Sequence, residues 1–225
     1  ARELDEGGFV ALQYDTESAW KTHEVDLRLQ RLDASGSLLW ERTLHYQGGL
    51  DFTGDVLPAD GGFVVMTGDG LWKFGPNGDA LWSRSYPGGN RFFAIAPVAQ
   101  GGFVLTSHVS DARARVLRVD AQGIALWSRS LSEFKWPGQI SVARNGDLLV
   151  SGINEVTDDT EDRIVHRPIV ARLSPTGDVL WARILPAKGP HDLIGWGYPI
   201  PELHVPETVD GAVNAATRGN PHPCL

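Results

Sequence analysis

The chain has 225 residues, of which 42% are hydrophobic and 21% are charged, a composition that excludes a disordered or fibrous protein. Its 26 Gly and 14 Pro favour many short strands joined by turns over a bundle of long helices. The formal net charge of -8 opposes binding to phosphate backbones, so we expect no nucleic-acid partner. No apolar run reaches the roughly 20 residues of a membrane span, so we expect a protein that does not span a membrane.

The first predicted element is a glycine turn that leads into an apolar, β-rich segment, GGFV at 7–10. Glycine supplies the backbone freedom of a tight turn, and the apolar residues after it are typical of a strand. The same pattern returns at 61–64, at 101–104, as NGDLLV at 145–150, and in a degenerate form as DGAV at 210–213.

The second predicted element is a hairpin that ends in tryptophan, DASGSLLW at 33–40. It recurs at 75–82, 120–127 and 174–181, always with Gly four residues before Trp and Leu directly before it. A basic residue stands nine positions before each Trp, and an arginine two positions after it. These residues are Arg31, Lys73, Arg118 and Arg172 before the tryptophans Trp40, Trp82, Trp127 and Trp181, and Arg42, Arg84, Arg129 and Arg183 after them. The constant spacing predicts a structural hairpin between a third and a fourth strand, with the later arginines flanking the indoles.

A further strand is predicted between these units, at 52–58, 92–98 and 138–144. Four short antiparallel strands in each period of about 40 to 54 residues are typical of a β-propeller blade. We therefore predict an all-β fold, a β-propeller of four-stranded antiparallel blades with four full repeats plus a partial fifth. Residues 1–225 form one domain with a tail at 218–225. The alternative is a β-sandwich with coincidental repeats.

Loop lengths distinguish the two ends of the predicted blades. From the last glycine of each turn to the next Trp the distances are 32, 20, 25 and 35 residues, and from each Trp to the next such glycine they are 22, 20, 19 and 30. Both variable connections emerge at the same end of an antiparallel blade. Binding usually resides in variable loops on a constant scaffold, so this end is the predicted binding face.

The G-x-x-L-W units resemble the tryptophan-bearing repeats of quinoprotein-like propellers, whose motif is A-x-D-x-x-T-G-x-x-x-W. They also resemble the GGFV…LDASGNVLW repeats of secreted bacterial proteins and lipoproteins. The resemblance implies an extracellular or periplasmic location, and it implies that Trp40, Trp82, Trp127 and Trp181 are structural residues that dock one blade onto the next. Members that oxidise alcohols or sugars have larger rings, a quinone and calcium. This chain has four complete units and a single cysteine, Cys224, so the resemblance implies the fold and not a dehydrogenase.

The aromatic and basic residues outside the repeats are the candidates for ligand binding, because exposed aromatics with a polar handle favour interfaces and clefts. The alternative is that they plug the channel or pack loops onto blades. The candidates are Trp20, His23, Arg91, Trp136, His191 and Trp196.

No metal centre or cofactor is predicted. The stretch 156–167, VTDDTEDRIVHR, gathers acidic residues that are compatible with calcium, but their spacing fits no known loop, and we interpret the stretch as a solvated acidic loop. The seven histidines lack the spacing of a helical zinc site. No catalytic residue is assigned, because the sequence holds no nucleophile elbow, phosphate loop or dinucleotide motif.

The leading hypothesis for function is a noncatalytic scaffold that binds a protein or glycan partner through the variable-loop face. The alternative is an enzyme on a propeller scaffold, either a quinone-dependent dehydrogenase or a hydrolase or lyase. A third hypothesis makes the chain one piece of an oligomer or larger assembly.

Closure of the ring has two solutions. Residues 202–209 and 211–217 are candidates for an innermost and a second strand after the fourth Trp unit. Either 202–209 completes the first blade and closes a ring of four, or the chain holds a partial fifth blade of a larger ring. We favour the partial fifth, because 225 residues divided by five gives 45, which matches the repeat period. Direct pairing of 202–209 with 8–14 would establish the ring of four.

Overall fold

The computed structural model describes residues 1–4, 7–14, 24–47, 54–68, 70–86, 91–109, 113–158, 163–186, 203–204 and 216–217. These residues form strands, turns and no helix, and the strands build four antiparallel four-stranded sheets. The predicted fold class is therefore confirmed: the chain is a β-propeller of four-stranded blades. Within the described part of the chain, no helix has the length and apolar character of a membrane span.

Each blade is a simple meander in which sequential strands are neighbours. Blade I contains β1 (Arg2–Glu3), β2 (Phe9–Tyr14), β3 (Glu24–Leu32) and β4 (Leu38–Gln47). Blade II contains β5 (Asp55–Ala59), β6 (Gly62–Met66), β7 (Gly70–Phe74) and β8 (Ala80–Ser85). Blade III contains β9 (Arg91–Pro97), β10 (Phe103–Val109), β11 (Arg113–Val119) and β12 (Ala125–Leu131). Blade IV contains β13 (Trp136–Val142), β14 (Leu148–Asp158), β15 (Arg163–Leu173) and β16 (Val179–Ile184).

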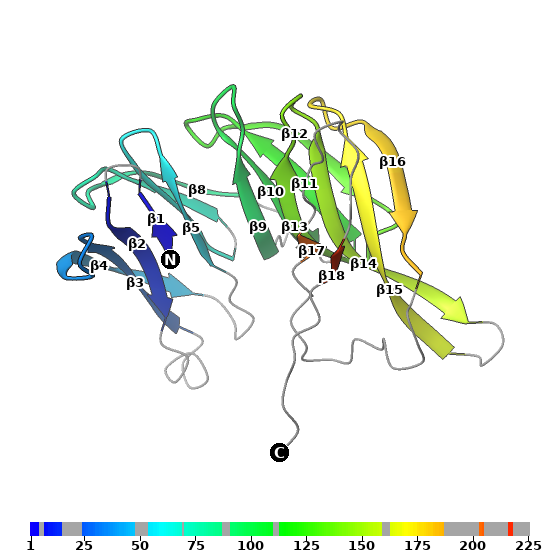
Figure 1. Ribbon diagram of the computed structural model, residues 1–225, viewed down its shortest axis with the longest axis horizontal. Helices are drawn as coiled ribbons and strands as arrows, with labels where there is room; N and C mark the ends of the chain where they lie inside the picture. The colour runs from blue at the N-terminus through cyan, green and yellow to red at the C-terminus, as the bar shows by residue number, and fades with distance from the viewer. Residues whose placement is uncertain are drawn as a thin grey trace, which may run out of the picture.

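The blades follow one another in an arc, with blade I at one end and blade IV at the other (Figure 1). Contact between blades runs through their first strands: β5 lies against β1 and β2, β9 against β5, and β13 against β9 and β10. Three apolar clusters in the described residues fill the three spaces between successive blades. The core is thus divided among the blade interfaces.

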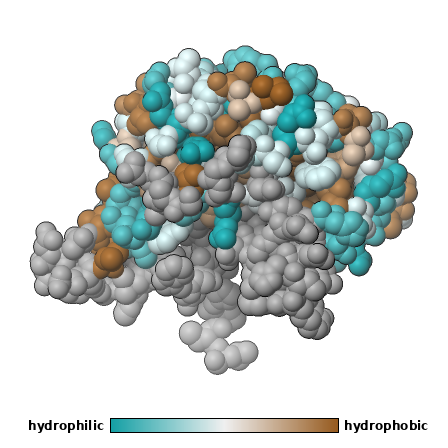
Figure 2. Space-filling model, turned by 180° about the vertical axis from the view of Figure 1, so that it is seen from behind, coloured by the Kyte–Doolittle hydropathy of each residue, from teal (hydrophilic) through white to brown (hydrophobic). Residues whose placement is uncertain are grey.

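Burial falls from the inner strands to the outer ones. All residues of β10 are buried except His108, because neighbouring blades cover both faces of this strand. The outer strands β8, β12 and β16 are mostly exposed. From behind, the exposed apolar side chains lie interspersed with polar ones over the described surface (Figure 2).

A basic residue of the third strand stabilises the first turn of each blade. Arg31 Nη2 donates to the carbonyl oxygen of Gly7 at 3.0 Å, Lys73 Nζ to that of Ala59 at 2.8 Å, and Arg118 Nη2 to that of Gly101 at 2.6 Å. Burial lowers the pKa of the Lys73 ammonium and of the Arg118 guanidinium. The sequence shows the constant spacing of these residues but not this role, which depends on how the turn folds back over the third strand.

The leucine before each tryptophan is the extra residue of a β-bulge. In blade I, Arg31 pairs with Trp40 while Leu32 pairs with Leu38, so Leu39 has no opposite residue. The same register shift occurs in the other three blades. The bulged residues Leu39, Leu81, Leu126 and Leu180 are all more than half exposed.

The structure bears on two expectations about the residues that follow the fourth Trp unit. β17 (Leu203–His204) pairs antiparallel with β18 (Ala216–Thr217), at the positions expected for the first two strands of a partial fifth blade. The pairing of 202–209 with 8–14 is not found in the described residues, because β2 has β1 on one edge and β3 on the other.

The expectation of an acidic loop at 156–167 is wrong for most of that stretch. Residues 156–158 end β14, and residues 163–167 begin β15. The pairing of the two strands continues to Asp158 and Arg163, so the insertion lengthens a hairpin. Residues 159–162 lie outside the described part.

Candidate functional site

The site candidate is the end of the blades at which the variable connections emerge. There β9 and β13 begin and β10 and β14 end. In blade IV, β13 pairs with β14 only as far as Trp136 and Ile153, whereas β14 and β15 remain paired for five more residues. The resulting hairpin extends beyond the other strands of its blade, at the lower right of Figure 1.

Four side chains gather at the base of this hairpin, and we call them the blade IV cluster: Lys135, Trp136, Glu155 and His166. Glu155 and His166 are directly opposite each other on β14 and β15, with 3.7 Å between Glu155 Oε2 and His166 Nε2. Lys135 Nζ lies 3.4 Å from the same carboxylate oxygen. A carboxylate thus lies between an imidazole and an ammonium group.

The indole of Trp136 joins these charged groups. Its centroid lies 5.0 Å from that of the His166 ring in an edge-to-face arrangement, and Lys135 Nζ lies 5.7 Å from the Trp136 ring centroid. Such contacts are typical of aromatic pairs and of cation–π pairs. The cluster therefore presents an apolar ring together with hydrogen-bond donors and an acceptor.

The short connection before β13 is fixed to the core, which positions Lys135 and Trp136. Phe134 is buried in the cluster between blades III and IV, and the Lys135 amide donates to the carbonyl oxygen of Ile153 at 2.7 Å. A Cβ on Gly152 would lie 2.4 Å from the Trp136 carbonyl oxygen and 2.7 Å from the Phe134 ring. Glycine is required at 152 because the connection passes directly over it.

The same end of blade III carries further polar groups. Arg91, the first residue of β9, is exposed and pairs in register with His108. The Thr106 hydroxyl donates to the carbonyl oxygen of Gly138 at 2.8 Å and so links blade III to β13. The neighbouring hydroxyl of Ser107 is buried without a hydrogen-bond partner.

Two of the six ligand-binding candidates can be placed. Arg91 and Trp136 are the first residues of β9 and β13, so both lie at the variable-loop end. Trp20, His23, His191 and Trp196 lie outside the described residues.

Sequence reasoning missed Lys135, Glu155 and His166. The signal available was the distance of 35 residues from Gly146 to Trp181, which indicates a longer second hairpin in this blade. Within the described part of the chain, no group of three or more His, Cys, Asp or Glu is placed to hold a metal ion.

The repeated tryptophans lie at the opposite, constant end of the blades. A Cβ on Gly78 would lie 3.0 Å from the Trp40 ring, one on Gly123 2.8 Å from the Trp82 ring, and one on Gly177 2.8 Å from the Trp127 ring. Each of these indoles therefore lies directly under the glycine turn of the next blade. That these contacts hold the blades together stays a prediction.

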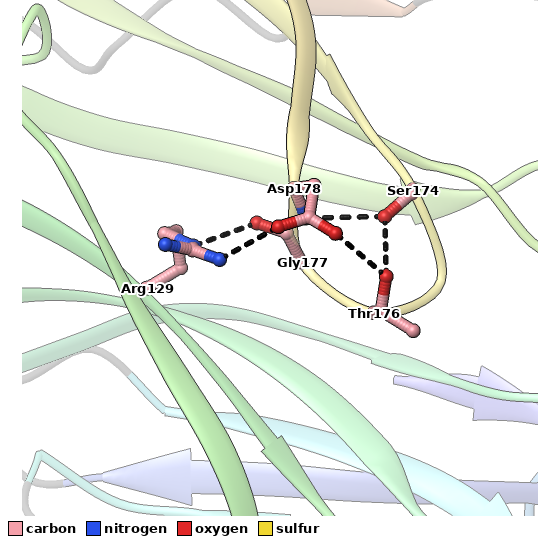
Figure 3. Close-up of polar contacts among 5 residues, drawn as sticks. All are labelled: Arg129, Ser174, Thr176, Gly177 and Asp178. Carbon is pink, nitrogen blue, oxygen red and sulfur yellow. Dashed lines mark hydrogen bonds and ion pairs between the residues drawn. The ribbon is translucent and has the colours of Figure 1, made fainter.

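The arginine after each of two tryptophans also reaches the next blade. Arg42 Nη2 donates to the Asn77 carbonyl oxygen at 3.1 Å. Arg129 Nε donates to the Gly177 carbonyl oxygen at 2.9 Å, and Arg129 Nη2 lies 2.8 Å from Asp178 Oδ1. Figure 3 shows this contact, with the other oxygen of Asp178 accepting from the Thr176 hydroxyl at 2.9 Å.

No protein-family model and no curated protein matches the sequence. Among solved structures, the chain is similar to the WD40 domain of Pan2 from Neurospora crassa, with a TM-score of 0.51, 10% identity, and coverage of 78% of this chain and 50% of that one. It is also similar to a protein of unknown function from Bacteroides caccae, with a TM-score of 0.49, 16% identity, and coverage of 71% and 54%.

A third similar structure is BamB from Moraxella catarrhalis, with a TM-score of 0.44, 16% identity, and coverage of 85% of this chain and 63% of that one. The chain thus spans less than two thirds of the length of these three proteins. WD40 domains are propellers, so the match to Pan2 supports the fold and carries no information about activity.

Proposed function

We propose that this chain is a noncatalytic binding module that holds a protein or glycan partner at the variable-loop end of its blades. The observation that carries the proposal is the blade IV cluster, which places an indole, an ammonium, an imidazole and a carboxylate at the base of the projecting hairpin. An aromatic ring beside paired polar groups is typical of protein interfaces and of ligand clefts.

At the opposite end of the blades, several turn groups are engaged within the scaffold. There the turn carbonyls of Gly7, Ala59 and Gly101 already accept from the basic residues of the third strands, and the glycine hairpins already rest on tryptophan rings.

The location that we propose, extracellular or periplasmic, is supported by the resemblance of the repeats to those of secreted bacterial proteins.

The test is a screen of the purified chain on a glycan array and a protein array, followed by titration of the strongest ligand. We expect Lys135→Ala and Glu155→Gln to weaken binding by about tenfold each, as charged contacts at an interface centre do. Gln122→Ala, an exposed turn residue at the constant end, is the matched control and leaves affinity unchanged. Absence of any binder together with turnover of a defined substrate would contradict the proposal.

The second candidate function is an enzyme, either a quinone-dependent dehydrogenase or a hydrolase or lyase. The observation that favours it is the pair of His166 and Glu155, because a carboxylate beside an imidazole can orient it for proton transfer. Addition of quinone and calcium tests the dehydrogenase by a change in absorption and by dye-linked activity. In any version that uses this pair, His166→Gln abolishes turnover while ligand binding persists.

A further inference from the structure

The three joints between successive blades share one arrangement. The tryptophan of an outer strand lies under the glycine hairpin of the next blade and packs in the same apolar cluster as the first apolar residue of that blade's second strand. Trp40 meets Phe63 edge to face with 5.9 Å between ring centroids. Trp82 packs in one apolar cluster with Phe103, and Trp127 in another with Leu148.

Blade I has the receiving half of such a joint, and none of the described residues docks on it. Gly36 occupies the position of Gly78, Gly123 and Gly177, yet no atom of the residues that the structure describes lies within 4 Å of the place where its Cβ would be. Phe9 occupies the position of Phe63 and Phe103, which are buried, but is itself only half-buried. Leu32 differs in the same way from its buried counterparts, which are Phe74, Val119 and Leu173.

Blade IV has the donating half of a joint. Trp181 pairs with Arg172 in the register that Trp40, Trp82 and Trp127 have with their own basic residues. None of the described glycines has Trp181 among its nearest neighbours. Val179 and Leu180 are about half exposed, as are Leu38 and Leu39 in the docked blade I, so the donating half is identified by the glycine contacts and not by this exposure.

We propose that these two halves bind each other between two copies of this chain. Trp181 of one copy lies under the Gly36 turn and against Phe9 of the other, and Arg183 donates to the Gly36 carbonyl as Arg129 donates to that of Gly177. The two surfaces lie at opposite ends of the arc (Figure 1). The contact is therefore head-to-tail, and two such joints close a ring of two copies.

The joints within the chain indicate what binds to the receiving surface of blade I. A blade with a tryptophan on its outer strand is what fills this receiving surface in the three joints described above. A second copy supplies that blade, and it also supplies a glycine turn for Trp181, which none of the described glycines provides. One contact between copies therefore covers both the receiving surface of blade I and the outer strand of blade IV.

Two variants test the proposal in the full chain by sedimentation velocity and light scattering over a wide concentration range. Gly36→Asn places a side chain where the indole docks. Asparagine tolerates the positive φ of 84° at this position, and a Cβ here meets none of the described residues within 4 Å, so the blade itself keeps its fold. Trp181→Ala removes the docking ring from the other half.

We expect the unchanged chain to form a dimer and each variant to raise the dissociation constant by more than about tenfold, as loss of an interface tryptophan does. An equimolar mixture of the two variants restores a dimer with one intact joint, because the Trp181→Ala copy keeps Gly36 and the Gly36→Asn copy keeps Trp181. Thermal unfolding of the Gly36→Asn monomer checks that it is folded. A monomeric unchanged chain at every concentration, or variants that associate as strongly as it does, would overturn the proposal.

Discussion

Arg172 Nε donates to Asp147 Oδ2 at 2.6 Å in blade IV, whose first turn carries an aspartate where the other three blades have a second glycine. In those blades the basic residue of the third strand donates to turn carbonyls, and a Cβ on Gly8, Gly62 or Gly102 would collide with a third-strand carbonyl. In blade IV, the carboxylate of Asp147 therefore accepts the hydrogen bond that turn carbonyls accept in the other three blades.

The first prediction concerns this ion pair, whose side chains are only 20% and 11% exposed. We expect Asp147→Ala and Arg172→Ala each to lower the free energy of unfolding, because either removes one member of a partly buried ion pair and with it the attraction on the charge that remains. In a double-mutant cycle the two changes couple by about 1–3 kcal/mol. A coupling energy near zero would show that the pair makes no net contribution.

The second prediction compares two turns with the same backbone. Gly36 and Gly123 have φ of 84° and 74°, so alanine at either position introduces about 1 kcal/mol of strain. At Gly123 the new methyl group also meets the Trp82 ring at 2.8 Å, whereas at Gly36 it meets no atom of the described part of the chain within 4 Å. We expect Gly123→Ala to destabilise the chain by about 1–3 kcal/mol more than Gly36→Ala, since overpacking costs that much. Urea unfolding at low protein concentration measures the difference, and equal losses would contradict the docking role of Trp82.

The third prediction is that substitutions at two adjacent residues of β10 change the free energy of unfolding in opposite directions. Thr106→Val removes the hydroxyl that donates to Gly138 and leaves that carbonyl unpaired, so stability falls by about 1–2 kcal/mol. Ser107→Ala removes a buried hydroxyl that has no partner, so stability rises by about 1 kcal/mol. Thermal or urea unfolding of both variants decides, and a loss of stability in Ser107→Ala would contradict the assignment.

The fourth prediction is a dependence on alkaline pH. Burial raises the pKa of Tyr86 above its ordinary value of 10.0, and its hydroxyl donates to the Gly123 carbonyl oxygen at 2.8 Å. The unfolded chain ionises this phenol near pH 10 while the folded chain keeps it protonated. Its contribution to stability is therefore complete below pH 10 and is lost as pH rises above that value. Tyr86→Phe abolishes this part of the dependence, which urea unfolding from pH 8 to 11 measures. An identical pH profile in the variant would contradict it.

The fold could be predicted because the repeated residues have strict requirements for backbone conformation or for packing. Glycine at a turn with positive φ and tryptophan under the next turn tolerate few replacements, so Gly36 and Trp40 have recognisable counterparts along the chain. The varying distances between the first-turn glycines and the tryptophans also distinguished the constant end from the variable end, and Arg91 and Trp136 lie at the variable end.

The blade IV cluster could not be predicted, because it depends on strand register. Glu155 and His166 meet only because β14 and β15 stay paired beyond β13, and the acidic composition of 156–167 favoured a loop. The role of the third-strand basic residues was likewise hidden, since it requires the turn carbonyls of Gly7 and Gly101 to point back at Arg31 and Arg118.

The bulged leucine of each blade has a consequence for the behaviour of the protein in a crowded solution. The fourth strands β4, β8, β12 and β16 are the last strands of their sheets, and regular edges of this kind invite strands of other molecules to add and grow fibres. An unmatched residue bends the strand and interrupts its ladder of hydrogen bonds, and Leu39, Leu81, Leu126 and Leu180 interrupt the outer edge of each described blade at the same place. In each of the four described blades, the bulge therefore hinders the addition of a foreign strand to the outer edge. The residue that forms the bulge is itself apolar and exposed, properties that by themselves would favour aggregation.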